Sequence, residues 1–270
     1  MSSPADVDLG LALDVARECA DVAIRITRET PLGDIDTKAH AADVVTQVDT
    51  AVERAVRAII GERLPDHVVV GEEYGGEAGA GPTWYCDPVD GTTNLAAGLP
   101  WTSFSLSLAV GADPLVGVVA DPWRSEVLHA VAGGGAFLND APATSPPHRN
   151  ALSGGVVLTE WAAHRPWPGM LEFLSLLSER FCTTRVMGSS TLTLAHLGAG
   201  RCSGAVVGEF HPEDHLAASL ICAEAGLTVW DESGTTRLFP STGGIMVARP
   251  AVAAELFELW SRARHTGPDA

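Results

Sequence analysis

The segment 84–95 reads WYCDPVDGTTNL, and its residue types suit the binding of metal cations. Asp87 and Asp90 lie three residues apart, and Pro88 between them fixes one backbone angle. Hard divalent cations prefer oxygen ligands, and Mg²⁺ usually keeps several waters beside one or two carboxylates and phosphate oxygens. The spacing therefore predicts that both aspartates face a pair of cations, with the Val89 carbonyl oxygen as a further ligand.

The residues that follow suit the binding of an anion. Gly91 permits a backbone angle that other residues rarely adopt, and Thr92 and Thr93 would start a short helix whose free N–H groups can hold an anion. A carboxylate-bound cation site beside an amide-lined anion site describes a metal-dependent phosphatase. The same residue types are ordinary in turns, so the motif alone is equally compatible with a surface turn.

Acidic residues elsewhere in the chain favour the phosphatase interpretation. The apolar run before GEE predicts a buried strand that delivers Glu72 at its end. Asp214 opens the helical pattern DHLAASLICAEAG. Strand ends and a helix start would then present four candidate carboxylates, which are Glu72, Asp87, Asp90 and Asp214.

The remaining pattern supplies the elements that must position these groups. Apolar residues at helical spacing predict a long first helix that ends before Pro31 and a second helix that Pro65 closes. Alternating strands follow, so we expect two helices against a largely antiparallel sheet. Beyond a polar linker at 143–151, strand-like and helical segments alternate, which indicates an α/β layer and a final helix from about Ala251. This change predicts two domains, 1–145 and 146–270, in a fold that combines α+β and α/β parts.

The chain is strongly acidic, with 34 Asp and Glu against 17 Lys and Arg and a formal net charge of -17. Such a charge repels nucleic acid and anionic membranes, so we expect neither as a partner. Bound cations would reverse the local sign for a phosphorylated substrate. The sequence shows no signal peptide pattern and no membrane-length apolar run, and its five scattered cysteines form no CxxC pair. We therefore expect a cytoplasmic protein.

These motifs resemble those of the inositol monophosphatase family of Mg²⁺-dependent, lithium-sensitive phosphatases. DPVDGTTN is similar to the family's signature, and GEE at 71–73 is similar to its glutamate motif. DVVTQVD at 43–49, with Lys38 before it, resembles the upstream threonine–aspartate segment, and EDHLAASLICAEAG resembles the second signature. The motifs occur in the family's order over nearly the whole chain. The resemblance implies a layered αβαβα sandwich, a homodimer, and hydrolysis of a small phosphorylated substrate.

The resemblance also implies how cations would be held. Glu72, Asp87 and the Val89 carbonyl oxygen would bind a first Mg²⁺ ion, and Asp87, Asp90 and Asp214 would bind a second. Glu72 would share a weaker third ion, so each active site would hold two or three.

Phosphate binding and water activation follow from the same resemblance. The backbone N–H groups of Gly91, Thr92 and Thr93 would grip the phosphate. Asp49 and Thr92, hydrogen-bonded to each other, would orient or deprotonate the attacking water together with Glu72 at the first metal. The displacement would be in line and would form no covalent intermediate.

A few positions depart from the family's pattern or leave alternatives open. Glu213 stands where a tryptophan usually precedes the second-signature aspartate; we interpret it as a helix N-terminal charge, with an extra acid near the metals as the alternative. Val207 stands where inositol-specific members place a glutamate that binds sugar hydroxyls, and Glu209 could substitute for it. Ser189 and Ser190 are candidate substrate contacts and, equally, helix-capping residues.

Several substrates and other functions compete with the first choice, inositol 1-phosphate. Histidinol phosphate is the main alternative, followed by fructose 1,6-bisphosphate and 3′(2′),5′-bisphosphate nucleotides. A zinc hydrolase built on His211 and His215 is disfavoured because Pro212 interrupts a continuous helix and the HExxH order is absent. A non-catalytic, regulatory family member should have lost a metal-binding carboxylate, and all four are present.

Overall fold

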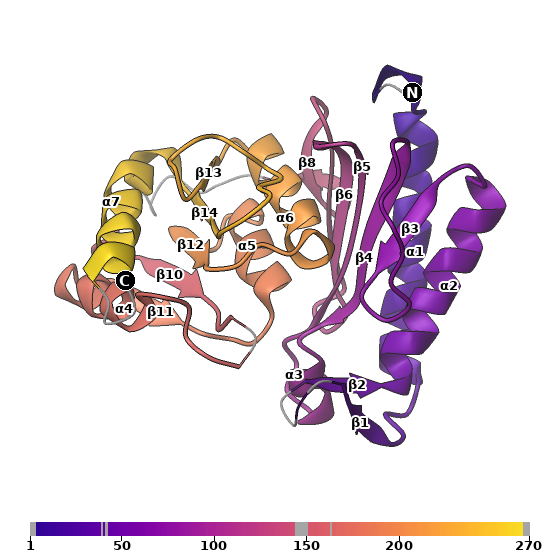
Figure 1. Cartoon of the computed structure of the whole chain (residues 1–270), viewed down its shortest axis with the longest axis horizontal. Helices are drawn as coiled ribbons and strands as arrows, with labels where there is room; N and C mark the ends of the chain where they lie inside the picture. Colours follow the sequence, from indigo (N-terminus) through magenta and orange to yellow (C-terminus); the bar gives the residue numbers. More distant parts are fainter. Residues whose placement is uncertain (1–3, 39, 41–42, 144–150, 163, 267–270) are drawn as a thin grey trace.

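The computed structural model describes residues 4–38, 40, 43–143, 151–162 and 164–266. Two large sheets alternate with three layers of helices, so the layers run α, β, α, β, α across the molecule (Figure 1). The layered fold predicted from the resemblance is confirmed. The predicted linker at 143–151 and the domain boundary at 145/146 fall largely on residues outside the described ranges.

The first helical layer consists of α1 (Leu9–Glu29) and α2 (Gln47–Arg63), which pack on each other and on the large sheet. Both helices end just before the predicted prolines. The apolar stripes predicted from spacing are buried, as Val52, Val56 and Ile60 on α2 illustrate. A short antiparallel hairpin between the two helices was not predicted, because its strands have only three residues each: β1 (Ile35–Thr37) and β2 (Val44–Thr46).

The large sheet has the strand order β3-β4-β5-β6-β7-β8-β9. Its neighbours are antiparallel except for the parallel pair β3 and β4, which confirms the largely antiparallel prediction. The central strands are buried along most of their length because helices cover both faces. The strands are β3 (Val68–Gly71), β4 (Pro82–Asp90), β5 (Ser103–Val110), β6 (Asp113–Asp121), β7 (Glu126–Val131), β8 (Gly135–Leu138) and β9 (Ala141–Pro142).

The middle layer consists of α5 (Ser190–Gly198) and α6 (Pro212–Glu224), which lie between the two sheets. These helices are buried nearly all round, because a sheet covers each side of them. Close packing of α6 on β6 depends on Gly117, where an added Cβ would lie 2.8 Å from the Ala217 carbonyl oxygen. The start of α6, which carries Asp214, is thereby held against the large sheet.

The second sheet has the order β11-β10-β12-β14-β13. Strands β10, β11 and β12 are parallel, whereas β14 runs antiparallel to both of its neighbours. The sequence prediction omitted β14, whose four residues carry no alternating pattern. The strands are β10 (Val156–Thr159), β11 (Thr183–Arg185), β12 (Gly204–Val207), β13 (Thr228–Asp231) and β14 (Ile245–Ala248), and the outer helices are α4 (Met170–Glu179) and α7 (Pro250–Thr266).

Along the part of the chain that the structure describes, no helix combines the length and the apolar character needed to cross a membrane. The five cysteines are all buried, and none forms a disulfide. Their burial agrees with the interpretation of these residues as small apolar side chains.

His196 on α5 is a buried titratable group of the middle layer. Its ring stacks on that of Trp101 with centroids 4.8 Å apart, and its Nδ1 accepts a hydrogen bond from Arg201 Nη1 at 2.7 Å. The residue is 4% exposed. Burial, and then the positive charges of Arg201 and Arg124, lower the pKa of His196 to about 4. His196 is therefore neutral in the folded chain at pH 7.

This histidine should make the protein sensitive to acid. The unfolded chain takes up a proton at His196 below about pH 6.5, whereas the folded chain does so only near pH 4, so stability falls as the pH drops between these values. At pH 5 the loss from this group should be about 2 kcal/mol relative to pH 7.5. His196→Asn, which keeps an acceptor near the Nδ1 position, should remove most of that difference in urea unfolding. The exposed His211→Asn is the control, and an unchanged pH dependence in His196→Asn would contradict the assignment.

Candidate active site

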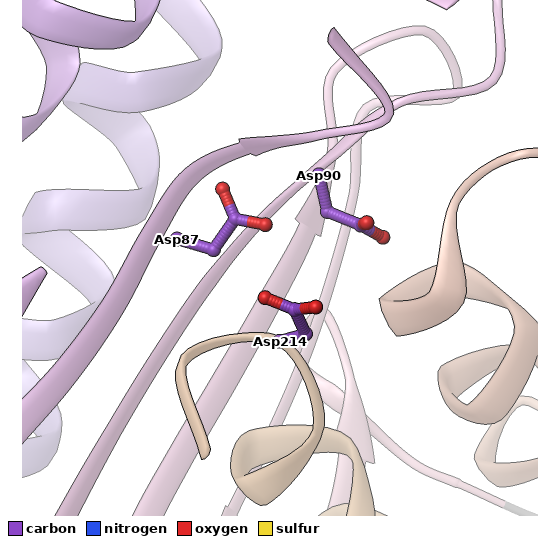
Figure 2. Close-up of side chains that lie close together, drawn as sticks. All are labelled: Asp87, Asp90 and Asp214. Atoms are coloured by element: carbon purple, nitrogen blue, oxygen red, sulfur yellow. The ribbon is translucent and has the colours of Figure 1, made fainter. Parts of the chain in front are cut away.

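Three aspartates meet between β4 and the start of α6. One carboxylate oxygen from each of Asp87, Asp90 and Asp214 can be chosen so that all lie within 4.8 Å of one another. Figure 2 shows Asp87 and Asp90 projecting from the β4 side and Asp214 projecting toward them from the helix. The carboxylates of Asp87 and Asp90 thus lie close to that of Asp214, although more than 120 positions separate them in the sequence.

A β-bulge places the two aspartates of β4 on the same face. Side chains three residues apart in a regular strand point to opposite faces. Asp87 pairs with Ser105 and Asp90 pairs with Ser103, so three steps along β4 match two steps along β5. The extra residue restores the alternation, and both side chains project from the same side of β4, toward the space that Asp214 also borders.

The first turn of α6 is fixed from two sides. Ser105 Oγ on β5 donates a hydrogen bond to the Glu213 carbonyl oxygen at 2.7 Å, and Thr191 Oγ1 on α5 donates to the Asp214 carbonyl oxygen at 2.6 Å. Pro212 at the start of the helix lacks only an N–H that would have no helical partner. The helix dipole favours an acidic residue at this end, which suits both Glu213 and Asp214.

The negative charges of the clustered aspartates favour the binding of a cation between them. Burial raises the pKa of Asp87 well above its ordinary value, and the charges of Glu72, Asp214 and Asp90 raise it further. Burial likewise raises the pKa of Asp214, with further contributions from Asp90 and Glu72. Buried carboxylates at this spacing repel one another unless a proton or a cation lies between them. Because every ligand atom is an oxygen, the residues present fit a hard divalent cation such as Mg²⁺.

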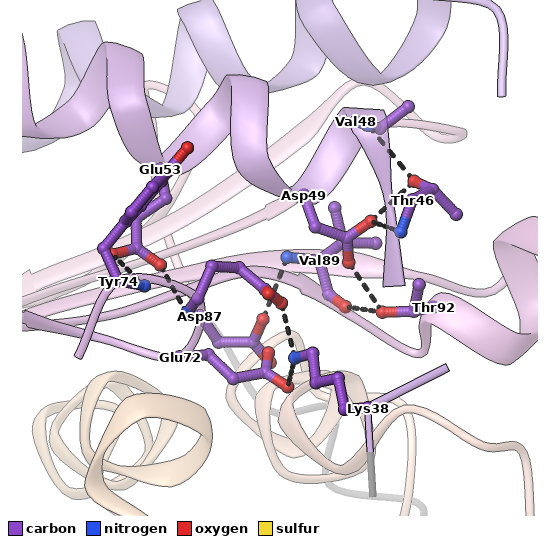
Figure 3. A network of polar contacts seen from close by, with 11 residues as sticks. Lys38, Thr46, Val48, Asp49, Glu53, Glu72, Tyr74, Asp87, Val89 and Thr92 are labelled. Carbon is purple, nitrogen blue, oxygen red and sulfur yellow. Dashed lines mark hydrogen bonds and ion pairs between the residues drawn. The ribbon is translucent and has the colours of Figure 1, made fainter. Parts of the chain in front are cut away.

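Glu72 lies at the edge of this cluster and has a cationic partner. It lines the same hollow as Asp87, whose pKa its charge helps to raise, and its Oε1 is 2.9 Å from Lys38 Nζ (Figure 3). The same Lys38 nitrogen lies 2.6 Å from Glu73 Oε1. The turn that carries both glutamates is held by buried Glu53, which accepts hydrogen bonds from the N–H groups of Glu73 at 2.7 Å and Tyr74 at 3.2 Å. Sequence reasoning missed Glu53, although an acid on the apolar stripe of α2 was a visible signal.

The predicted hydrogen bond between Asp49 and Thr92 is present. Thr92 Oγ1 donates to Asp49 Oδ1 at 2.8 Å and lies 2.9 Å from the Val89 carbonyl oxygen (Figure 3). Asp49 Oδ2 accepts hydrogen bonds from both N and Oγ1 of Thr46, at 3.0 and 2.6 Å. Asp49 is fully buried, and burial raises its pKa although these hydrogen bonds oppose the shift. A capping box at the start of α2 therefore orients Asp49 toward Thr92.

Gly91 caps the short helix α3 (Thr92–Ala96), which starts at Thr92 as predicted. Its φ of 92° lies in the left-handed region, and an added Cβ would lie 2.8 Å from the Gly188 carbonyl oxygen. A larger residue would therefore strain the turn and also displace the neighbouring segment. The start of α3 borders the aspartate cluster, where Gly91, Thr92 and Thr93 line one wall.

Two adjoining hollows converge on the aspartates. The aspartate hollow, of about 230 Å³, is lined by Asp43, Val44, Glu72, Asp87, Val89, Asp90, Gly91, Thr92, Thr93, Gly188 and Asp214. The side hollow, of about 200 Å³, is lined by Asp90, Glu160, Trp161, Ala162, Gly188, Ser190, Val207, Gly208, Glu209, His211, Asp214 and His215. Asp90, Gly188 and Asp214 belong to both, so a molecule in the side hollow would adjoin the cluster.

Some of the predicted substrate-binding residues line the side hollow, and one of them is buried away from both hollows. Ser190 and Glu209 line the side hollow, as does Val207. Ser189 does not line either hollow, because its fully buried hydroxyl donates to Asp90 Oδ2 at 2.5 Å and accepts from Leu192 N–H at 3.3 Å. Its place corresponds to the helix-capping alternative, with an added contact to Asp90 that the sequence did not reveal.

Glu160 is a buried acid that sequence reasoning did not single out. It follows β10, and its carboxylate accepts hydrogen bonds from the N–H groups of Met187 at 2.9 Å and Gly188 at 2.8 Å and from Thr193 Oγ1 at 2.6 Å. Burial raises the pKa of Glu160 to about 7. An acid directly after an apolar strand, the pattern that identified Glu72, was the available signal.

The two histidines of HPEDH do not form a metal pair. His211 N–H donates to His215 Nδ1 at 2.9 Å, so that nitrogen caps the start of α6. Burial lowers the pKa of His215 to about 3, and the ring stays neutral. Among the residues that the structure describes, the cluster able to hold a metal ion is the group of three aspartates.

Comparison with known proteins agrees with this geometry. A sequence model of the inositol monophosphatase family matches residues 6–265. The chain belongs to the inositol monophosphatase family. Nus factor SuhB of Pasteurella multocida is 33% identical over 253 residues, which cover 92% of this chain and 93% of that protein. Human inositol monophosphatase 2 is 34% identical over 209 residues, or 74% and 72% of the two chains. The solved structure of the Thermotoga maritima IMPase superposes with a TM-score of 0.84 at 26% identity, covering 94% of this chain and 98% of that chain.

Because the carboxylates of the cluster repel one another, we expect that neutralising one of them will not lower the stability of the metal-free protein. Without divalent ions, Asp87→Asn should be at least as stable as the wild type, because it relieves repulsion while its side-chain oxygen still accepts from Val89 N–H. Mg²⁺ at 100 times its Kd should stabilise the wild type by about 2.7 kcal/mol and the variant far less. Thermal unfolding with chelator and with Mg²⁺ measures both effects.

Asp121→Asn supplies the matched control. Asp121 is also a buried aspartate, but its carboxylate pairs with Arg124 at 2.6 Å and does not belong to the cluster of three. This variant should lose stability in chelator and keep the gain from Mg²⁺. A strong destabilisation of Asp87→Asn in chelator would mean that repulsion does not dominate the cluster.

Proposed function

We propose that the chain is a Mg²⁺-dependent phosphomonoesterase that hydrolyses a small alcohol phosphate. The observation that carries this proposal is the convergence of Asp87, Asp90 and Asp214 beside the Asp49–Thr92 pair. One part of that arrangement can hold divalent cations, and the other can position a water molecule next to them. Membership of the inositol monophosphatase family supports the same conclusion.

The residues would hold two or three Mg²⁺ ions. Glu72, Asp87 and the Val89 carbonyl oxygen would bind the first ion and Asp87, Asp90 and Asp214 the second, while Glu72 would share a weaker third. All five positions line the aspartate hollow, which supports this assignment. When bound, Mg²⁺ would lower the pKa of a coordinated water and stabilise charge on the phosphoryl group and the leaving oxygen.

The polypeptide would orient the attacking water and the phosphate. Thr92 Oγ1 donates its proton to Asp49, so its lone pairs are left to accept a hydrogen bond from a water in the aspartate hollow. Asp49, whose pKa is raised by burial, would take up the proton that the water releases through Thr92. Glu72 would orient the same water from the cation side. The N–H groups of Gly91, Thr92 and Thr93 would bind phosphate oxygens at the start of α3.

The side hollow would accept the alcohol part of the substrate. Its volume of about 200 Å³ suits a small polyol or amino alcohol. Ser190 and Glu209 supply polar groups there, whereas Val207 is apolar. We propose inositol 1-phosphate first and histidinol phosphate as the main alternative, with fructose 1,6-bisphosphate and 3′(2′),5′-bisphosphate nucleotides less favoured. The similarity to human inositol monophosphatase 2 supports the first choice.

A non-catalytic role is the second candidate, because several relatives carry the name Nus factor SuhB. A net charge of -17 opposes direct contact with nucleic acid, so such a role would involve protein partners. Retention of the aspartate cluster and of the Asp49–Thr92 pair favours catalysis. We further propose a cytoplasmic homodimer, which size measurement in solution would test.

A phosphate-release panel across the four substrate classes, with Mg²⁺ and with chelator, tests the function. Asp214→Asn should lower kcat/KM at least ~100-fold, because it removes a cation ligand and part of the charge that holds the ion. Glu213→Gln, on the same helical turn, should stay within about threefold if its charge serves only the helix end. Near-normal turnover in Asp214→Asn, or no release from any substrate by the wild type, would refute the proposal.

Glu209 tests the choice of alcohol. If its carboxylate binds hydroxyl groups of inositol 1-phosphate, Glu209→Ala should raise KM by about tenfold and leave kcat nearly unchanged, because that contact is the same in the ground and transition states. Steady-state kinetics with inositol 1-phosphate and histidinol phosphate separate the two substrates. If the KM for each substrate is the same in Glu209→Ala as in the wild type, Glu209 does not take part in substrate recognition.

A further inference from the structure

Segment 187–193 touches two aspartates of the cluster. Ser189 Oγ and Thr191 N–H both donate to Asp90 Oδ2, at 2.5 and 2.7 Å. Thr191 Oγ1 also donates to the Asp214 carbonyl oxygen at 2.6 Å. The position of this segment therefore sets the orientation of the Asp90 carboxylate and helps to fix the helical turn that carries Asp214.

Glu160 anchors the same segment from the opposite side. Its Oε1 accepts from Met187 N–H at 2.9 Å and from Thr193 Oγ1 at 2.6 Å, while its Oε2 accepts from Gly188 N–H at 2.8 Å. The residue is only 4% exposed, so water cannot readily replace these hydrogen bonds. The anchor engages the segment at both of its ends.

Asn94 on α3 also binds segment 187–193, so this residue and Glu160 together clamp the segment. Its Nδ2 donates to the carbonyl oxygens of Met187 at 2.8 Å and Gly188 at 3.2 Å. Gly188 has a φ of 83°, and an added Cβ would lie 2.9 Å from Asn94 Nδ2. The segment is therefore held between Glu160, which directly follows β10, and helix α3, whose start forms the proposed phosphate site.

We propose that Glu160 is a positioning residue for cation binding, which acts by anchoring segment 187–193 and thereby orienting Asp90. This inference rests on the proposed function of the site. Both carboxylate oxygens of Glu160 already accept hydrogen bonds from the protein, and Glu160 does not line the aspartate hollow, so we assign it no direct contact with the cation. Its effect reaches the metal through Ser189 and Thr191.

Above its pKa of about 7, Glu160 is a carboxylate and accepts from all three donors of the anchor. A carboxylate can face three donors at once, whereas a glutamine would turn an NH₂ group toward at least one of them. A buried donor left without an acceptor is costly, so the segment should shift or loosen in Glu160→Gln. The substitution hardly changes side-chain size, which separates the effect from loss of packing.

Binding of Mn²⁺ without substrate, measured by calorimetry, tests the proposal directly. Glu160→Gln should bind Mn²⁺ 10- to 100-fold more weakly than the wild type, the range usual for residues that support metal ligands. The Mg²⁺ concentration for half-maximal phosphate release should rise by a similar factor. The KM for the phosphate ester at saturating Mg²⁺ should change by less than about threefold.

Glu224→Gln is the matched control. The carboxylate of Glu224 also accepts from two backbone N–H groups, those of Gly133 and Gly135, each at 2.8 Å, but it lies at the far end of α6 from Asp214. This variant should lose stability and keep wild-type affinity for Mn²⁺. Equal losses of Mn²⁺ affinity in Glu160→Gln and Glu224→Gln would overturn the proposal, because both would then act only through stability.

Thr193→Val covers the case in which Glu160→Gln does not fold. It removes one of the three contacts to Glu160 and should weaken Mn²⁺ binding in the same direction by about threefold or more. If Glu160→Gln folds, wild-type Mn²⁺ affinity in both variants would overturn the proposal. If Glu160→Gln does not fold, wild-type Mn²⁺ affinity in Thr193→Val would overturn it. A wild-type protein that binds Mn²⁺ but releases no phosphate would refute the proposed function and leave this metal-binding inference testable.

Discussion

Mutual repulsion among three clustered carboxylates, two of them buried and one half-buried, is the constraint on which the rest of this structure depends. Asp87, Asp90 and Asp214 present oxygens within 4.8 Å of one another, and burial with like charge raises the pKa of Asp87 well above its ordinary value. The fold must hold these groups together against that repulsion, and a divalent cation would turn the repulsion into attraction. The net negative charge of the whole chain affects its solubility and its choice of partners, whereas the local cluster of carboxylates determines whether a cation binds at the site.

The layered architecture explains how the constraint is met. Asp87 and Asp90 belong to the large sheet, and Asp214 starts a helix that is packed between both sheets. Hydrogen bonds from β5 and α5 fix that helix start, while Glu160 and Asn94 clamp the segment that contacts Asp90. The site is thus assembled where three layers meet, and a change in any of these layers can alter the aspartate cluster.

The sequence predicted the parts of this account that depend on local patterns. Apolar spacing predicted α1, α2 and α6, and the glycine in DPVDGTTN predicted the left-handed turn that starts α3. It could not predict the bulge that brings Asp87 and Asp90 to one face, because a bulge depends on pairing with β5. The same limit applies to Ser189, whose capping role was foreseen but whose contact with Asp90 joins residues 99 positions apart. Strand β14 was missed because four buried residues carry no distinctive period.

Anomalous scattering from Mn²⁺ in crystals of the wild-type protein would test the central claim most directly. The account predicts at least one strong Mn²⁺ peak with oxygens of Asp87, Asp90 and Asp214 among its ligands, at distances of about 2.0–2.3 Å, near those of Mg²⁺. Peaks found only elsewhere, for example at His211, or no peak at millimolar Mn²⁺, would contradict it.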